Sequence, residues 1–198
     1  MSSKIEWLKD PITGKPGYTI NPVKGLCPMA CPYCYARRMY KRFGWNPEIR
    51  FEAMAFNPLI GLTTPSKVFI GSTMELFGDW VKADEMSKIF SLVRYYNTHT
   101  FIFLTKCPGN LHLWSPFPDN CWVGVSWVGD DETKPLRYLA DVHAKIKFIS
   151  LLLIKCFQYR SSHIGIRCGI QLISKPRNNR KRNQSSSWSF KNSSFKFG

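Results

Sequence analysis

Several features are missing from the 198-residue sequence, and each absence excludes a class of protein. The sequence has no run of 18 or more uninterrupted apolar residues, so no membrane-spanning helix is expected. Its first seven residues lack the apolar core of a signal peptide, which predicts a cytoplasmic protein. Apolar residues make up 44% of the chain and aromatic residues 15%. This composition predicts a globular domain with a hydrophobic core and excludes a wholly disordered chain.

Acidic residues are absent after Asp141. The net charge is +15, but residues 1–141 hold 16 Lys and Arg against 13 Asp and Glu, a balance of only +3. Residues 142–198 contain 12 Lys and Arg and no acid. A net charge of +15 usually indicates a nucleic-acid partner. Here the excess belongs to the C-terminal segment, whereas the front of the chain is nearly balanced.

The seven cysteines are an odd number in a chain without an export signal, so a disulfide framework is not expected. Three of them lie within eight residues, and this density favours metal or redox chemistry. The other four are scattered singly and are interpreted as inert buried thiols: Cys107, Cys121, Cys156 and Cys168.

Short apolar runs alternate with helix-like stretches through the middle of the chain. The expected strands are 18–23, 67–71, 100–105, 122–126 and 145–150. The expected helices are 35–42, 83–96 and 134–142, the second with apolar residues at helical spacing. Runs such as Phe101-Ile102-Phe103-Leu104 suggest strands covered on both faces. The alternation predicts an α/β fold with a parallel sheet, either open or curled into a barrel.

The sequence Gly25-Leu26-Cys27-Pro28-Met29-Ala30-Cys31-Pro32-Tyr33-Cys34 places three cysteines at the spacing C-x3-C-x2-C. Three thiolates on one tight loop can ligate three irons of a 4Fe-4S cluster, and no fourth cysteine follows at ferredoxin spacing. One iron would therefore be open to a small molecule. Structural zinc is a weaker interpretation, because it needs four ligands and no second close pair is present. A chance group of buried cysteines is the remaining alternative.

With an aromatic residue, Tyr33, before the third cysteine, the motif resembles the signature of the radical S-adenosylmethionine (SAM) superfamily. Further blocks resemble a phage-associated family of unknown function that is often placed with radical SAM proteins, and Cys34-Tyr35 is shared with spore photoproduct lyase, a DNA-repair enzyme. The similarity covers about residues 4–150, and its blocks are Ile5-Glu6-Trp7, Asn21–Gly25, Cys31–Arg37, Val68–Gly78, Phe103–Lys106 and Val123–Ser126.

The resemblance implies a partial (β/α) barrel of radical SAM type and a site built from matching positions. Cys27, Cys31 and Cys34 would hold a 4Fe-4S cluster, and SAM would chelate the open iron. Tyr33 would lie near the SAM adenine, and the segment Gly71-Ser72-Thr73 would face the SAM amino group, although the superfamily's common Gly-Gly-Glu is absent there. An ordinary turn with a helix-capping hydroxyl is an equal alternative for this segment.

Two further strand ends complete the expected site. Ser126 and Lys106 are candidates for contacts with the SAM ribose or carboxylate, or with a substrate. Glu75 and Asp79 are candidates for positioning substrate. The expected activity is reductive cleavage of SAM, with an external electron donor, to begin radical chemistry on a substrate that the sequence does not identify.

The similarity to the family stops near Ser150, almost where the acids end. Residues 1–150 are therefore expected to form the βα domain, and 151–198 a disordered basic low-complexity tail. The tail is either a genuine basic arm or out-of-frame translation after a frameshift near Ser150, which would truncate the barrel and leave activity in doubt. The alternative function is non-enzymatic nucleic-acid binding by the tail, with Trp188, Phe190 and Phe195 as stacking groups.

Overall fold

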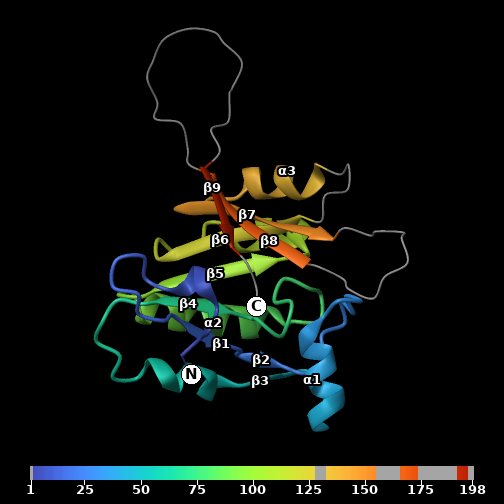
Figure 1. The fold of residues 1–198 in the computed structure, drawn as a ribbon. Coiled ribbons are helices and arrows are strands. Elements are labelled where there is room, and N and C mark those ends of the chain that lie inside the picture. The colour runs from blue at the N-terminus through green and yellow to red at the C-terminus, as the bar shows by residue number, and fades with distance from the viewer. Residues whose placement is uncertain (1, 128–132, 155–165, 174–190, 196–198) are drawn as a thin grey trace, which may run out of the picture.

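A seven-stranded sheet runs through the computed structural model, which describes residues 2–127, 133–154, 166–173 and 191–195. Five neighbouring strands are parallel and follow one another in chain order across the sheet (Figure 1). They are β1 (Tyr18–Ile20), β4 (Lys67–Ile70), β5 (Thr100–Thr105), β6 (Cys121–Trp127) and β7 (Ile146–Ile154). Helices alternate with these strands, so the structure confirms the expected α/β class with a parallel sheet.

Both faces of the parallel sheet are covered, as the apolar runs predict. On one face Val68, Ile70, Phe101 and Phe103 belong to the main core. The other face carries a smaller cluster, whose buried members are Leu8, Phe69, Ile102 and Phe148. Successive strand residues point to opposite faces, which is why neighbours such as Phe101 and Ile102 belong to different clusters.

The three helices lie close to where the sequence predicts them. They are α1 (Tyr35–Phe43), α2 (Ala83–Tyr95) and α3 (Lys134–Asp141). Helix α2 buries its apolar stripe of Met86, Ile89, Phe90 and Val93 in the main core. Helix α1 differs because it buries only Ala36, and it stands at one end of the sheet beside β2 and β3 (Figure 1). None of the helices in the described ranges is long and apolar enough to cross a membrane.

The expected strand 18–23 is two strands in different sheets, and this corrects the sequence prediction. Strand β2 (Val23–Lys24) pairs antiparallel with β3 (Arg50–Phe51) in a separate two-stranded sheet. The break falls at Asn21-Pro22, since proline has no N–H to donate to a strand neighbour. The sequence also did not predict β3 or three 3-10 helices, η1 (Glu6–Leu8), η2 (Ala53–Leu59) and η3 (Pro108–Trp114).

The segment after Ser150 also differs from the expected disordered tail wherever it is described. Strand β7 continues to Ile154, and β8 (Ile166–Ile173) and β9 (Lys191–Phe195) extend the sheet by antiparallel pairing. Apolar residues alternate along β8 at Ile166, Cys168, Ile170 and Leu172, a period of two that suits a strand. The tail predictions for residues 155–165, 174–190 and 196–198 lie outside the described residues.

Candidate functional site

The three motif cysteines lie on one loop between β2 and α1. Cys27, Cys31 and Cys34 are free thiols and are each half-buried. The backbone N–H of Cys34 donates to the Cys31 carbonyl at 3.0 Å, which closes a tight turn between them. Ala30 has a φ of 46°, a left-handed conformation that costs an L-residue roughly 1–2 kcal/mol. Such strain persists where the surrounding structure imposes it, and it concentrates at functional loops.

Helix α1 holds this loop through two hydrogen bonds. The Arg37 guanidinium donates to the Cys27 carbonyl at 2.8 Å, and the Gly25 backbone N–H donates to the Tyr40 hydroxyl at 2.8 Å. Gly25 has a φ of 123° and lies so close to Glu48 that a Cβ would come within 2.6 Å of its carbonyl oxygen. Two residues of α1, Arg37 and Tyr40, therefore fix the backbone of the cysteine loop.

The loop lies against the ends of β4 and β5, on the carboxyl edge of the parallel sheet. Burial raises the pKa of the Cys27 thiol, while the Glu75 backbone N–H, which donates to its sulfur, opposes that rise. Burial also raises the pKa of Tyr33, and the neighbouring thiols of Cys31 and Cys34 act in the same direction. The Lys106 ammonium lies 5.9 Å from the centre of the Tyr33 ring. Tyr33, the three cysteines and the ends of two strands thus lie in one neighbourhood.

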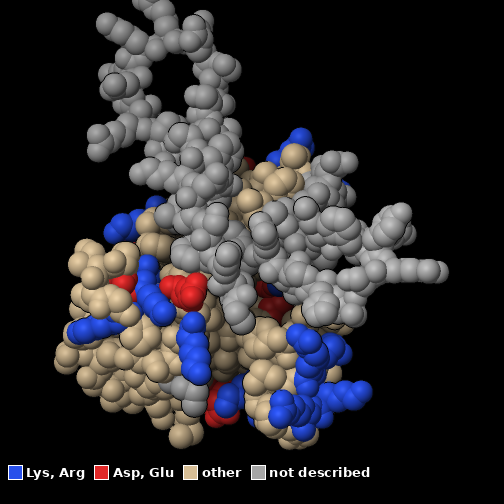
Figure 2. Space-filling model, viewed as in Figure 1, with Lys and Arg blue, Asp and Glu red and all other residues tan. Residues whose placement is uncertain are grey.

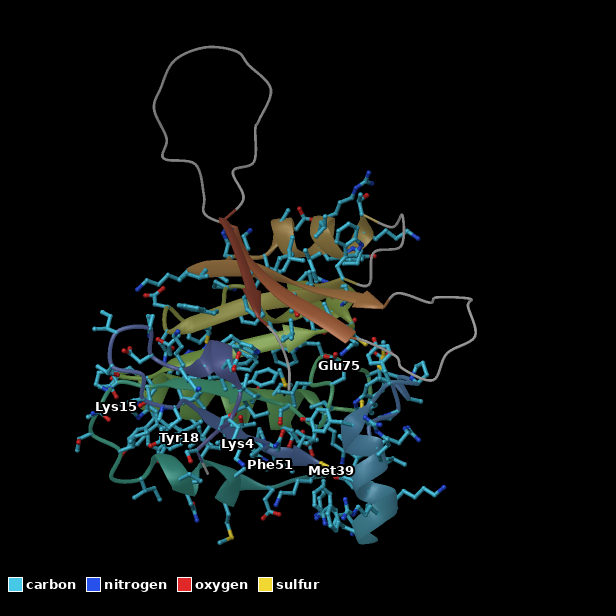
Figure 3. The ribbon with its side chains drawn as sticks, viewed as in Figure 1. Lys4, Lys15, Tyr18, Met39, Phe51 and Glu75 are labelled. Carbon is cyan, nitrogen blue, oxygen red and sulfur yellow. The ribbon has the colours of Figure 1, made fainter. Side chains whose placement is uncertain are left out.

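Glu75 is the buried carboxylate of this neighbourhood, and it lies at the sheet edge near α1 (Figure 3). It accepts hydrogen bonds from the backbone N–H of Phe77 at 3.0 Å, the Thr105 hydroxyl at 2.8 Å and the Lys106 backbone N–H at 2.7 Å. Burial raises its pKa, and these three donors act against that rise. Through these bonds Glu75 links the segment after β4 to the end of β5, and its part in positioning substrate stays a prediction.

Cys107 is a fourth cysteine that the structure brings to the loop. Its thiol lies 3.6 Å from the Met29 sulfur, and burial together with the charge on Glu75 and the nearby Cys27 and Cys31 raises its pKa to about 11. The sequence predicts an inert buried thiol at Cys107 because this cysteine stands singly, 73 positions beyond Cys34. The signal that could have found it is its place directly after a strand, at the edge where the loop was expected. Cys121, by contrast, is buried in the core as predicted.

The predicted SAM-facing segment Gly71-Ser72-Thr73 follows β4 and lies beside α1. Asn21, at the end of β1, accepts hydrogen bonds from the Ser72 hydroxyl at 3.2 Å and the Thr73 backbone N–H at 3.1 Å. The Tyr35 hydroxyl donates to the Ser72 carbonyl at 2.9 Å. Two of the groups predicted to meet SAM therefore have partners in the protein, and the Thr73 side chain lines a hollow of about 360 Å³.

Of the other predicted residues, Ser126 is half-buried near the end of β6, opposite Ser150 of β7. Asp79 accepts a hydrogen bond from the Asn110 side chain at 2.8 Å, which ties the β4–α2 connection to η3. Lys106 is the candidate cation that the structure brings to the cysteine loop. The tail residues Trp188 and Phe190 lie outside the described residues, so binding by the tail stays a prediction.

The three cysteine thiols are of the ligand type that iron–sulfur clusters use. Within the ranges that the structure describes, no three His, Cys, Asp or Glu side chains converge on one metal ion. A mononuclear zinc site needs such convergence. In a 4Fe-4S cluster each thiolate binds a different iron, so the sulfurs stand further apart. Three free, half-buried thiols on a single loop are compatible with that arrangement.

No curated protein and no solved structure matches the chain significantly. A family model described as "Protein of unknown function (DUF5131)" matches residues 2–155, which include β1 to β7 and the whole cysteine loop. The family's description states no activity, so the radical SAM resemblance stays a prediction. Because the match covers more than half of the sequence, the chain belongs to the DUF5131 family.

Proposed function

We propose that this protein is an iron–sulfur protein of the radical SAM type, in which Cys27, Cys31 and Cys34 hold a 4Fe-4S cluster. The observation that carries the proposal is the cysteine loop itself: three free thiols on one tight, strained loop at the carboxyl edge of a parallel βα sheet. Active sites of βα barrels lie at that edge, where the loops after successive strands meet.

The cluster and SAM together would supply one-electron reductive cleavage of SAM to methionine and a deoxyadenosyl radical, with the electron coming from an external donor. The protein's own residues position these groups. Arg37 and Tyr40 hold the loop backbone through Cys27 and Gly25. Glu75 holds the ends of β4 and β5 together behind the loop.

The remaining candidate residues are proposed to contact SAM. Tyr33 is proposed to lie against the adenine, since its half-buried ring is beside the thiols of Cys31 and Cys34. Thr73 and Ser126 offer hydroxyl groups, and Gly71 offers backbone groups, at the ends of β4 and β6. Lys106 offers a cation next to Tyr33, which suits the SAM carboxylate or an anionic group of the substrate.

The test is anaerobic reconstitution of the full chain with iron and sulfide, followed by incubation with SAM and a chemical reductant. We expect about four irons per chain, an EPR signal from the reduced cluster that changes when SAM is added, and release of 5′-deoxyadenosine. Cys27→Ala, Cys31→Ala and Cys34→Ala should each lower the iron content and abolish cleavage.

Cys121→Ala is the matched control, because this cysteine is fully buried at the start of β6, away from the loop. It should reconstitute as the unchanged chain does. Iron content that is the same in the Cys27→Ala and Cys121→Ala variants would contradict the proposed cluster. A stable cluster without any 5′-deoxyadenosine would contradict the assignment of SAM as its partner.

A further inference from the structure

The segment from Lys24 to Phe51, which contains α1, is the most basic part of the first 141 residues. It holds six Lys and Arg and a single acid, Glu48, whereas acids outnumber Lys and Arg, twelve to ten, in the rest of residues 1–141. In Figure 2 these Lys and Arg side chains gather at the lower right, over α1. The excess positive charge of residues 1–141 is therefore local to one surface next to the cysteine loop.

The charges on α1 repel one another, and no ion pair within the described part of the chain neutralises them. Arg37 and Lys41, and likewise Arg38 and Arg42, are four residues apart, a spacing at which like charges destabilise a helix. The first turn of α1 contains no acid. Among the described residues, no ion pair involves a cation of α1. A polyanion bound along this face would relieve the repulsion.

Exposed aromatic rings lie among these cations. Gly44 ends α1 with a φ of 60°, and the chain turns back so that Trp45 stacks on Phe43, with ring centres 5.5 Å apart. Trp45 also meets the edge of Tyr40 at 5.3 Å. Phe43 and Trp45 remain 54% and 42% exposed. Nucleic-acid bases stack on such rings, and proteins that bind single strands combine them with a basic groove.

A hollow of about 460 Å³ lies between the helix and this turn. Its lining includes Arg37, Arg38 and Lys41 on α1, and Trp45 after it. Cations and an aromatic ring therefore line the same space. The charge, the stacking groups and the shape all fit one or two nucleotides better than a membrane surface. An interfacial helix buries a broad apolar face, whereas α1 exposes three cations and only two aromatic rings, those of Tyr35 and Phe43.

We propose that α1 and the turn through Trp45 form a binding surface for single-stranded nucleic acid. Phosphates would meet Arg38, Lys41 and Arg42, and a base would stack at Trp45. Because Arg37 and Tyr40 tie α1 to the cysteine loop, a bound strand would lie beside the proposed cluster. If the proposed function holds, on which this step rests, nucleic acid is its substrate class.

The experiment measures fluorescence anisotropy of a labelled 15-nucleotide single strand, as DNA and as RNA, titrated with the full chain at several salt concentrations. The test variant is Arg38→Ala/Lys41→Ala/Arg42→Ala, which changes exposed positions and introduces the best helix former. The control variant, Lys4→Ala/Lys9→Ala/Lys15→Ala, removes the same charge from exposed lysines near the N-terminus. Of these, Lys4 and Lys15 lie apart from Met39 of α1 (Figure 3). Both variants keep the basic tail, whose own binding is thereby held constant.

We expect the test variant to bind more weakly than the control and to lose about 2 from the slope of log affinity against log salt, as three lost phosphate contacts to a single strand predict. Trp45→Ala should weaken binding about fivefold or more. Equal affinities of the test and control variants would overturn the proposal. Binding of the chain to anionic phosphatidylserine vesicles without binding to either oligonucleotide would also overturn it. Because binding is measured without iron or SAM, its failure is distinct from failure of the cluster proposal.

Discussion

The Thr105 hydroxyl donates a 2.8 Å hydrogen bond to the buried carboxylate of Glu75, and this bond joins the end of β5 to the segment that follows β4. The same carboxylate receives the backbone N–H groups of Phe77 and Lys106. Three donors converge on one side chain at the edge of the sheet where the cysteine loop lies. Beyond the backbone pairing of β4 with β5, part of the connection between these two segments therefore depends on a single buried acid.

Replacing Glu75 with glutamine tests that dependence. A glutamine side chain keeps one acceptor oxygen but presents an NH₂ group where the carboxylate had its second acceptor, so at least one buried donor loses its partner. We expect Glu75→Gln to lower the free energy of unfolding by about 1–3 kcal/mol, measured by urea denaturation. Glu48→Gln is the control, because Glu48 is exposed and its carboxylate has no hydrogen bond among the described residues. Equal stability of the two variants would contradict the role of Glu75 as the connection.

Much of the fold follows from local patterns in the sequence. The apolar run from Thr100 to Thr105 is a strand with the expected bounds, and α2 differs from its predicted range by one residue. The division of 18–23 into two strands was not predicted, because the partner of Val23 is Phe51, far along the chain. Local periodicity carries no information about such long-range pairing.

The sequence predicts only part of the site, because local patterns do not show which distant segments meet. The three cysteines of the loop are neighbours in sequence, so their spacing identifies them. Cys107 and the Glu75–Thr105 bond depend on how the ends of β4 and β5 meet, which only the folded chain determines. The sequence makes Glu75 a candidate for positioning substrate, but it does not show that this acid is buried among three donors.

The anchoring of the cysteine loop can be tested at Tyr40. Tyr40→Phe removes the acceptor for the Gly25 N–H, a bond of 2.8 Å, and leaves that donor without its protein partner. We expect the free energy of unfolding to fall by about 1 kcal/mol and a chelator to remove iron faster from the reconstituted protein. The matched variant Tyr95→Phe changes a hydroxyl that is exposed on α2, and it should behave as the unchanged chain. Unaltered iron release in Tyr40→Phe would show that this bond does not hold the loop.

Packing on the second face of the sheet is tested at Gly124. A Cβ at this position would overlap the Phe148 ring on the neighbouring strand β7. We expect Gly124→Ala to lower the free energy of unfolding by about 1–3 kcal/mol, as overpacking does. Adding Phe148→Leu should restore part of the loss, since it makes room for the methyl group. Two losses that simply add in the double variant would show that the two side chains do not compete for this space.

The pH dependence of stability should report on His99, which is 2% exposed and packed between Tyr96 and Phe101. Burial lowers its pKa below the ordinary value of 6.5. As the pH falls through 6.5, the unfolded chain therefore takes up a proton before the folded chain does, and the folded state loses stability until the pH reaches the lower folded pKa. Above 6.5 this histidine contributes no pH dependence.

Urea denaturation at pH 7.5 and pH 5.5 measures that loss. His99→Leu should reduce the difference between the two pH values, whereas the exposed His143→Gln should leave it unchanged. A difference that is the same in His99→Leu and in the unchanged chain would mean that other groups cause the acid sensitivity.

Whether the proposed cluster keeps an open iron depends on whether Cys107 binds that iron. Its thiol is close to Cys27 and Cys31, and its pKa of about 11 means that it is protonated at neutral pH in the protein without iron. Iron binding would have to displace that proton, and Cys107 lies outside the C-x3-C-x2-C loop that resembles the three-cysteine signature, so we expect it to stay unligated. Cys107→Ala should then keep its iron content and its cleavage of SAM, in contrast to Cys27→Ala.

Alkylation with iodoacetamide followed by peptide mass spectrometry gives an independent measurement. In the reconstituted protein Cys27, Cys31 and Cys34 should be protected, while Cys107 should react, faster as the pH rises toward 11. Protection of all four thiols, together with a lower iron content in Cys107→Ala, would instead indicate a cluster with four protein ligands. Such a cluster would leave no iron free for SAM, and an electron-transfer role would then replace the proposed SAM chemistry.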